Sequence, residues 1–180
     1  MDIDGKLRKA CAKRTLVHLH RDIDGADRIA GFVLAVGVEW ILLARLDPGI
    51  FLDGYTFVRR EDLRRVEKPA SRHFVRRALE LHGEWPPVAP EHRLDGIVPV
   101  LESAAAAFPL LTVHVERADP EVCYIGTPVK IGRRALRLAE VTPSAEWTDE
   151  PSKWRFADIT RVECGGRYER TLSEVAGLLG

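Results

Sequence analysis

The hydrophobic positions of this chain fall into short runs that predict strands, with helices before and after them. Leu16–Arg21 alternates apolar and polar residues with a period of two, which is typical of a half-buried strand. Residues 72–82 instead carry apolar side chains at helical spacing, with Phe74, Ala78 and Leu81 in one stripe that Val75 and Leu79 widen. The two periodicities together favour a mixed α and β protein.

Each half of the chain is predicted to hold a helix, five short strands and a second helix. In the first half these are a helix over residues 4–13, strands over 16–21, 28–36, 39–46, 55–59 and 64–67, and a helix over 72–82. In the second half they are a helix over 95–107, strands over 112–117, 122–131, 134–141, 153–156 and 158–163, and a helix over 167–179.

One frame of glycines occurs twice. Gly31 and Gly37 recur 95 residues later as Gly126 and Gly132, each pair lying in an aliphatic run that ends near a proline. A glycine pair of this kind could be mistaken for a phosphate-binding loop, but here it recurs inside predicted strands of both halves. Glycine is expected where a strand bends or where another backbone approaches closely, so we interpret both pairs as scaffold.

The duplication divides the chain into a first unit over residues 1–83, a proline-rich linker over 84–93 and a second unit over 94–180. Five short strands between helices favour a small closed barrel in each unit, because closure removes exposed strand edges. The predicted fold class is α+β, mainly β with flanking helices, as two tandem five-stranded barrels. An unclosed five-stranded antiparallel sheet backed by helices is the alternative.

The order of these elements resembles the Sm-like branch of the SH3-like barrels. The resemblance rests on Gly31, on the Trp-Ile-Leu-Leu run at residues 40–43 and on a one-turn helix before the last strand of the unit. It implies assembly into rings and binding of single-stranded RNA through an Asp/Asn pair and an Arg-Gly pair. Residues 37–39 are Gly-Val-Glu where the aspartate is expected, and Arg65-Val66 replaces Arg-Gly. The RNA-reading residues therefore do not carry over.

A looser similarity is to WYL-type ligand-sensing barrels. It is carried by the Trp-Ile-Leu-Leu-Ala run at residues 40–44 and by Asp-Leu-Arg-Arg-Val at residues 62–66. Ala135 takes the place of the tryptophan in the second half, so no ligand site is transferred from this similarity.

Composition indicates an ordinary soluble protein. Hydrophobic residues make up 46% and charged residues 30% of the 180, and 27 basic residues balance 27 acidic ones. A net charge of zero does not favour nucleic acid or an anionic membrane as partner. Three cysteines, Cys11, Cys123 and Cys164, do not suggest a disulfide framework, and neither a signal peptide nor a membrane-spanning run is recognisable. We expect a cytoplasmic location and no cofactor.

A basic run after residue 58 is the strongest candidate for a binding site. It comprises Arg59, Arg60, Arg64, Arg65, Lys68, Arg72, Arg76 and Arg77, against three acidic residues in the same stretch. Side by side, these groups could bind the phosphates of RNA or another single-stranded nucleic acid. The alternative is a solvated face on which arginines pair with nearby carboxylates such as Glu80.

Three histidines are candidates for a metal site. His18 and His20 lie two apart on a predicted strand and face the same side, and the repeat aligns His114 with His18. His-x-His is a plausible pair of metal ligands, but solvated histidines on an outer face explain the pattern as well.

No motif for catalysis is recognisable in the sequence, whether a phosphate loop, a nucleophile elbow or a zinc-protease helix. The sequence therefore favours a non-enzymatic binding or assembly protein that associates through barrel edges or amphipathic helices, as a homo-oligomer or with a protein partner. The alternatives are a nucleic-acid-binding protein and a metal-dependent protein.

Overall fold

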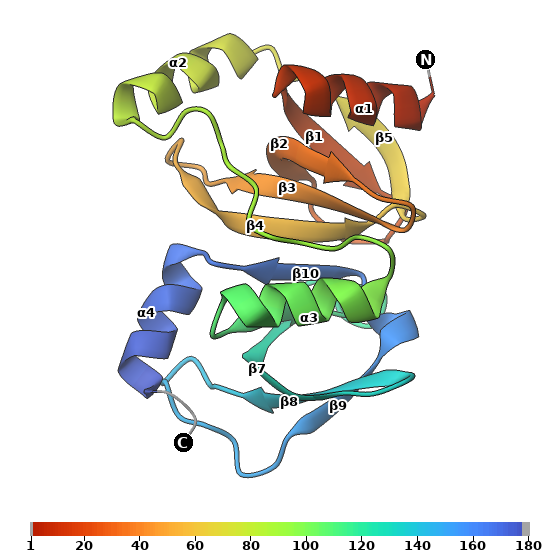
Figure 1. The fold of residues 1–180 in the computed structure, drawn as a ribbon, viewed down its shortest axis with the longest axis vertical. Coiled ribbons are helices and arrows are strands. Elements are labelled where there is room, and N and C mark those ends of the chain that lie inside the picture. Colours follow the sequence, from red (N-terminus) through yellow and green to blue (C-terminus); the bar gives the residue numbers. More distant parts are fainter. Residues whose placement is uncertain (1, 178–180) are drawn as a thin grey trace.

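Ten strands and four helices make up the described part of the chain, in the order predicted for two similar halves (Figure 1). The computed structural model describes residues 2–177. The helices are α1 (Ile3–Lys13), α2 (Arg72–His82), α3 (Ile97–Ala107) and α4 (Arg167–Ala176), with one 3-10 turn, η1 (Phe156–Asp158). The strands of the first half are β1 (Leu16–Arg21), β2 (Ile29–Val36), β3 (Trp40–Leu46), β4 (Leu52–Arg59) and β5 (Leu63–Glu67). Those of the second half are β6 (Leu111–His114), β7 (Cys123–Ile131), β8 (Ala135–Glu140), β9 (Ser152–Arg155) and β10 (Arg161–Cys164).

All ten strands belong to one antiparallel sheet, with the order β5-β1-β2-β3-β4-β10-β6-β7-β8-β9. The α+β class is thus observed, but the sheet is open and continuous, and the two separate closed barrels expected from the sequence are not observed. The two halves meet where β4 pairs with β10, a pairing that we call the joint. Figure 1 shows the halves stacked along the long axis of the molecule, with the joint between them.

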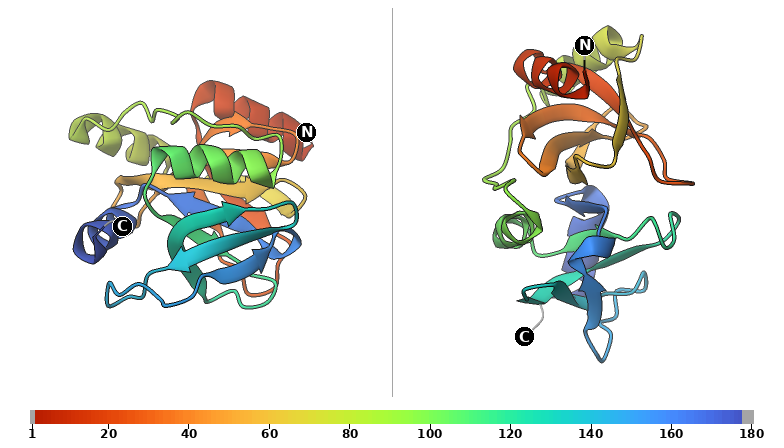
Figure 2. Two further views of the ribbon diagram at one scale, coloured as in Figure 1. Left: turned by 60° about the horizontal axis from the view of Figure 1, so that its bottom comes forward. Right: turned by 90° about the vertical axis from the view of Figure 1, so that its right-hand side faces the viewer.

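The helices pack against this sheet in different places. Figure 2 shows α1 and α2 at the end formed by the first half, and α3 lying beside the joint. The buried face of α2 consists of Val75 and Leu79, whereas Phe74 and Leu81 of the predicted stripe are exposed. The packed face is therefore the part of the predicted stripe that Val75 and Leu79 form. The last helix was expected to extend to residue 179, but its final residues lie outside the described part.

The strand registers define the internal repeat more exactly than the sequence does. Gly31 pairs with Arg45 in the first half, and Gly126 pairs with Glu140 in the second, which is an offset of 95 for both strands. Val17 lies opposite Gly31, but Leu111 lies opposite Gly126, so β1 and β6 are related by an offset of 94.

This offset corrects the alignment of the histidines. His114 corresponds to His20, and His18 corresponds to Thr112. The sequence alignment was wrong here because Val-His and Leu-His fit the same period-two pattern, and a shift of two residues preserves which side chains face inward.

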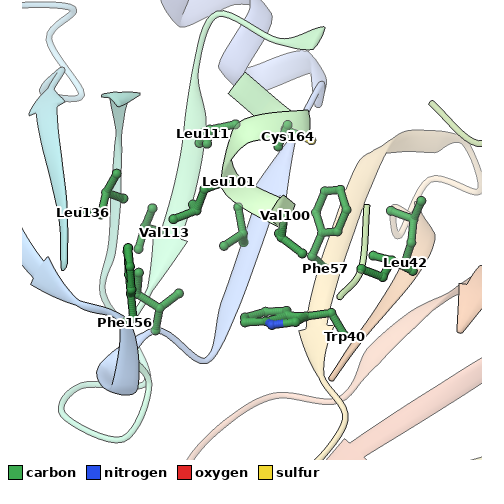
Figure 3. Close-up of a cluster of buried hydrophobic side chains, with 14 of the residues drawn as sticks. Trp40, Leu42, Phe57, Val100, Leu101, Leu111, Val113, Leu136, Phe156 and Cys164 are labelled. Atoms are coloured by element: carbon green, nitrogen blue, oxygen red, sulfur yellow. The ribbon is translucent and has the colours of Figure 1, made fainter. Parts of the chain in front are cut away.

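The largest hydrophobic core spans the joint. Trp40, Leu42 and Phe57 of the first half pack in one cluster with second-half residues such as Val113 and Leu136. Figure 3 shows Trp40 and Phe57 pointing toward this cluster, with α3 residues Val100 and Leu101 between the halves. The Pro-rich segment over residues 84–93 forms no helix or strand, as expected, and leads from α2 to α3. The joint is therefore a packed interface inside one molecule.

Candidate functional site

Two sets of His, Arg and Glu side chains occupy equivalent positions in the two halves. We call His20, Arg65 and Glu67 the edge triad, and His114, Arg161 and Glu163 the inner triad. The registers support the equivalence, because His20 lies opposite Arg65 and His114 lies opposite Arg161. Arginine and glutamate are shifted by 96 residues and histidine by 94, which are the offsets of their strands.

The inner triad has a defined hydrogen-bond pattern. The Nη2 atom of Arg161 lies 3.0 Å from Nδ1 of His114, and Nε2 of His114 lies 3.2 Å from a carboxylate oxygen of Glu163. A guanidinium can only donate, so Nδ1 of His114 accepts and its Nε2–H donates to Glu163. The second Glu163 oxygen accepts from Arg161 over 3.1 Å.

The joint covers the inner triad with groups from the first half. Thr56 on β4 donates its hydroxyl to Glu163 over 3.0 Å, and Arg45 on β3 donates to the same carboxylate over 3.0 Å. Glu163 keeps only 4% of its surface exposed and His114 only 7%. A buried carboxylate is tolerated where its lone pairs are satisfied by charged and hydroxyl donors, which is the arrangement here.

These donors determine the ionisation of Glu163. Burial raises its pKa, but the hydrogen bond from His114 and the charges of Arg161 and Arg45 outweigh burial, so the pKa lies well below the ordinary value of 4.5. Glu163 is thus ionised in the folded protein at any pH near neutrality.

A loss of stability in acid follows from this pKa. Because the pKa of Glu163 is lower in the folded than in the unfolded chain, its contribution is fully present above about pH 5 and is lost as the pH falls toward the folded value. We expect the free energy of unfolding, measured by urea titration, to fall between about pH 5 and pH 3. Glu116 and Asp53, whose pKa values are also lowered, act in the same direction, and Asp62, whose pKa is raised, opposes them.

The variant Glu163→Gln isolates one contribution. It should be less stable than the wild type at pH 7, and its stability should change less between about pH 5 and pH 3. An unchanged pH dependence in this variant would contradict the assignment of Glu163 as a main source of acid sensitivity.

The edge triad lacks such a cover. The Nε2 atom of His20 lies 3.0 Å from Glu67, and Arg65 lies 3.3 Å from the same carboxylate oxygen. The side chains of His20, Arg65 and Glu67 remain 26%, 58% and 47% exposed. Strand β5 ends the sheet, and among residues 2–177 its only pairing partner is β1. The same three groups are therefore covered in one half and accessible in the other.

Two shallow hollows flank the β5 edge. One, of about 310 Å³, is lined by Lys6, Lys9, Val66 and Lys68. The other, of about 450 Å³, is lined by His20, Arg21, Arg64 and Arg65. Basic side chains thus line both hollows beside this edge strand.

The structure divides the predicted basic run into three groups. Arg59 and Arg60 have structural contacts, because Arg59 donates to the carbonyls of Phe156 and Ile159 and Arg60 pairs with Asp4. Arg64, Arg65 and Lys68 lie on or just beyond β5. Arg72, Arg76 and Arg77 lie on α2, where Arg76 and Arg77 contact Glu80 and Arg72 donates to the carbonyl of Pro69.

The predicted metal ligands do not form a cluster. His18 and His20 lie on β1. His114 lies on β6, where its ring nitrogens form hydrogen bonds with Glu163 and Arg161 of β10. Within residues 2–177, no group of three or more His, Cys, Asp or Glu side chains could hold a metal ion.

Sequence reasoning missed Glu67 as a member of the edge triad. It also missed Glu163 as a member of the inner triad, with Arg45 and Thr56 as its donors. A signal was present, since Arg-Val-Glu occurs at both 65–67 and 161–163. Its meaning depends on which strand covers which copy, and that is visible only in the sheet order.

The chain matches no protein-family model, no curated protein and no solved structure. None of the helices in the described part is long and apolar enough to cross a membrane. The interpretation of the site therefore rests on its geometry.

Proposed function

We propose that this is a non-enzymatic assembly protein that accepts an extended strand of another polypeptide along β5. The observation that carries the proposal is the contrast between β5 and its counterpart β10. The outer edge of β10 is occupied by β4, whereas β5 is the last strand of the sheet. Strand addition to a free edge is a common mode of protein association, in which main-chain hydrogen bonds contribute affinity and side chains select the partner.

The repeated strand order supports a finer proposal about the fold. Each half follows the order last strand, then first to fourth, as β5-β1-β2-β3-β4 and as β10-β6-β7-β8-β9. We interpret each half as one Sm-like or SH3-like unit whose sheet continues into its neighbour instead of closing on itself. Under this interpretation the joint is an assembly contact contained within one chain.

A peptide with the sequence of β4, LDGYTFVR, is a direct probe of the β5 edge, because this strand already covers the equivalent edge. We expect the labelled peptide to bind the full chain, measured by fluorescence anisotropy. Its threonine corresponds to Thr56, so it should donate to Glu67 as Thr56 donates to Glu163. Glu67→Gln should then weaken binding about tenfold, since a hydrogen bond to a charged group contributes about 1.5–3 kcal/mol.

The experiment also includes a matched control variant and a test of RNA binding as the alternative function. Glu80→Gln makes the same chemical change on α2, away from β5, and should leave peptide binding unchanged. A labelled single-stranded RNA tests the alternative that Arg64, Arg65 and Lys68 serve nucleic acid. Failure of the peptide to bind, together with salt-sensitive RNA binding that Arg64→Glu abolishes, would replace the assembly function with RNA binding.

A further inference from the structure

We propose that the strand received by β5 is β5 of a second copy, so that two chains form a symmetric dimer around a continuous sheet. This inference rests on the proposed function, because it names the polypeptide that occupies the free edge. The most common symmetry of protein dimers is two-fold, and it brings the same surface of both subunits together. The argument starts from the sequence of β5 itself, Leu-Arg-Arg-Val-Glu.

Strand β5 is complementary to itself when it is paired antiparallel about Val66. Antiparallel pairing with Val66 opposite Val66 of the partner subunit places Arg65 opposite Glu67 of the partner subunit. The two-fold axis repeats this ion pair, so each subunit both supplies and receives an arginine. Opposite charges directly across an antiparallel pair stabilise it.

This pairing also gives Glu67 a second arginine, as the joint gives one to Glu163 of the inner triad. Glu163 is covered by Arg45 of β3, which lies beyond β4 in the sheet, in addition to Arg161 of its own strand. In the dimer, Glu67 keeps its own Arg65 and gains Arg65 of the partner subunit as the second cation. His20 lies beside both groups in the same way as His114 in the inner triad.

Strand β9, the other free end of the sheet, is a poorer occupant. When the register of the joint is applied, Lys153 takes the place of Phe57 and Pro151 that of Tyr55. Lysine and proline are residues that protect an edge from further pairing, since proline lacks a donor and lysine resists burial. Glu140 also replaces Arg45, so Glu67 would meet a carboxylate where Glu163 meets a cation.

On the other side of the strand, Arg64 would lie opposite Lys68 of the partner subunit. Both side chains are exposed, so water and salt screen this repulsion. The contact is five residues long, which is small for a stable interface, and we therefore expect a dimer that dissociates on dilution.

Sedimentation velocity on the full chain tests the inference through a charge swap. The wild type should shift from 20.2 kDa toward twice that mass over roughly a hundredfold rise in concentration. Glu67→Arg and Arg65→Glu should each weaken dimerisation about tenfold or more, because like charges then lie opposite one another. The double variant Arg65→Glu/Glu67→Arg restores both ion pairs in reversed order and should recover the dimer.

The charge swap also separates the possible outcomes. Thermal melting of each variant identifies any that fail to fold, and Glu80→Arg on α2 is the matched control that should dimerise normally. A dimer that neither single variant weakens, or a double variant that stays monomeric, would overturn the inference. A monomer that still binds the β4 peptide would overturn it and leave the proposed function standing, whereas a monomer that binds no peptide would overturn both.

Discussion

Replacing Glu116 with glutamine is expected to lower the free energy of unfolding by about 3–5 kcal/mol, because it leaves a buried arginine without its counterion. Glu116 accepts hydrogen bonds from Arg21 over 2.7 Å and from the hydroxyl of Thr160 over 2.7 Å, and it forms an ion pair with Arg161 over 3.1 Å. The side chain of Arg21 is completely buried, and that of Glu116 is 1% exposed. Arg21 belongs to the first half and Glu116 to the second, so this ion pair lies across the two halves.

The pKa of Glu116 indicates that its charge is required. Burial raises this pKa, but the hydrogen bond from Arg21 and the charges of Arg161 and Arg21 more than compensate, so the carboxyl titrates below its usual range. The amide of glutamine keeps the shape and could still accept one hydrogen bond. It cannot neutralise Arg21, which no water reaches.

Urea unfolding followed by circular dichroism measures the loss. The matched control is Glu80→Gln, since Glu80 pairs with Arg76 and Arg77 on the exposed surface of α2. Exposed pairs contribute about 1 kcal/mol or less, so this variant should stay close to the wild type. Equal effects of the two substitutions would show that the buried pair does not hold the halves together.

The local features of the fold could be predicted from the sequence. Period-two alternation identified β1, and the recurrence of Gly31 and Gly37 at Gly126 and Gly132 identified the repeat. These signals arise from neighbouring residues and from backbone geometry. They determine which segments become strands, and the observed order of helices and strands along the chain follows the predicted one in each half.

The continuity of the sheet could not be predicted in this way. The joint brings Thr56 to Glu163 across 107 residues and Arg45 to the same carboxylate across 118. No local periodicity specifies that β4 pairs with β10 instead of closing its own half. The candidate site could not be predicted for the same reason. Arg59 and Arg60 contact a carbonyl and a carboxylate of other segments, whereas Arg64 and Arg65 line a hollow, and only the fold distinguishes the two pairs.

The repeated glycines give the second large prediction, which is that Gly126→Ala should lower the free energy of unfolding by about 3 kcal/mol. A Cβ atom at position 126 would lie 2.0 Å from the carbonyl oxygen of Ala139, on the neighbouring strand β8. Gly31 is crowded in the same way, with the carbonyl oxygen of Ala44 at 2.4 Å. A backbone carbonyl within a sheet cannot rotate away without breaking its ladder, so the strands must separate.

The severity of each substitution should follow these distances if close approach is the reason for glycine. Gly132→Ala is the graded control, because its nearest neighbour is the carbonyl oxygen of Ala135 at 3.1 Å, and we expect a loss below about 1 kcal/mol. Thermal melting of the three variants should therefore give Gly126→Ala and Gly31→Ala clearly lower midpoints than Gly132→Ala. Similar midpoints for all three would show that the close approach of the neighbouring strand is not the reason for glycine at these positions. Close approach of a neighbouring strand would then no longer explain why the same spacing of glycines occurs in both halves of the chain.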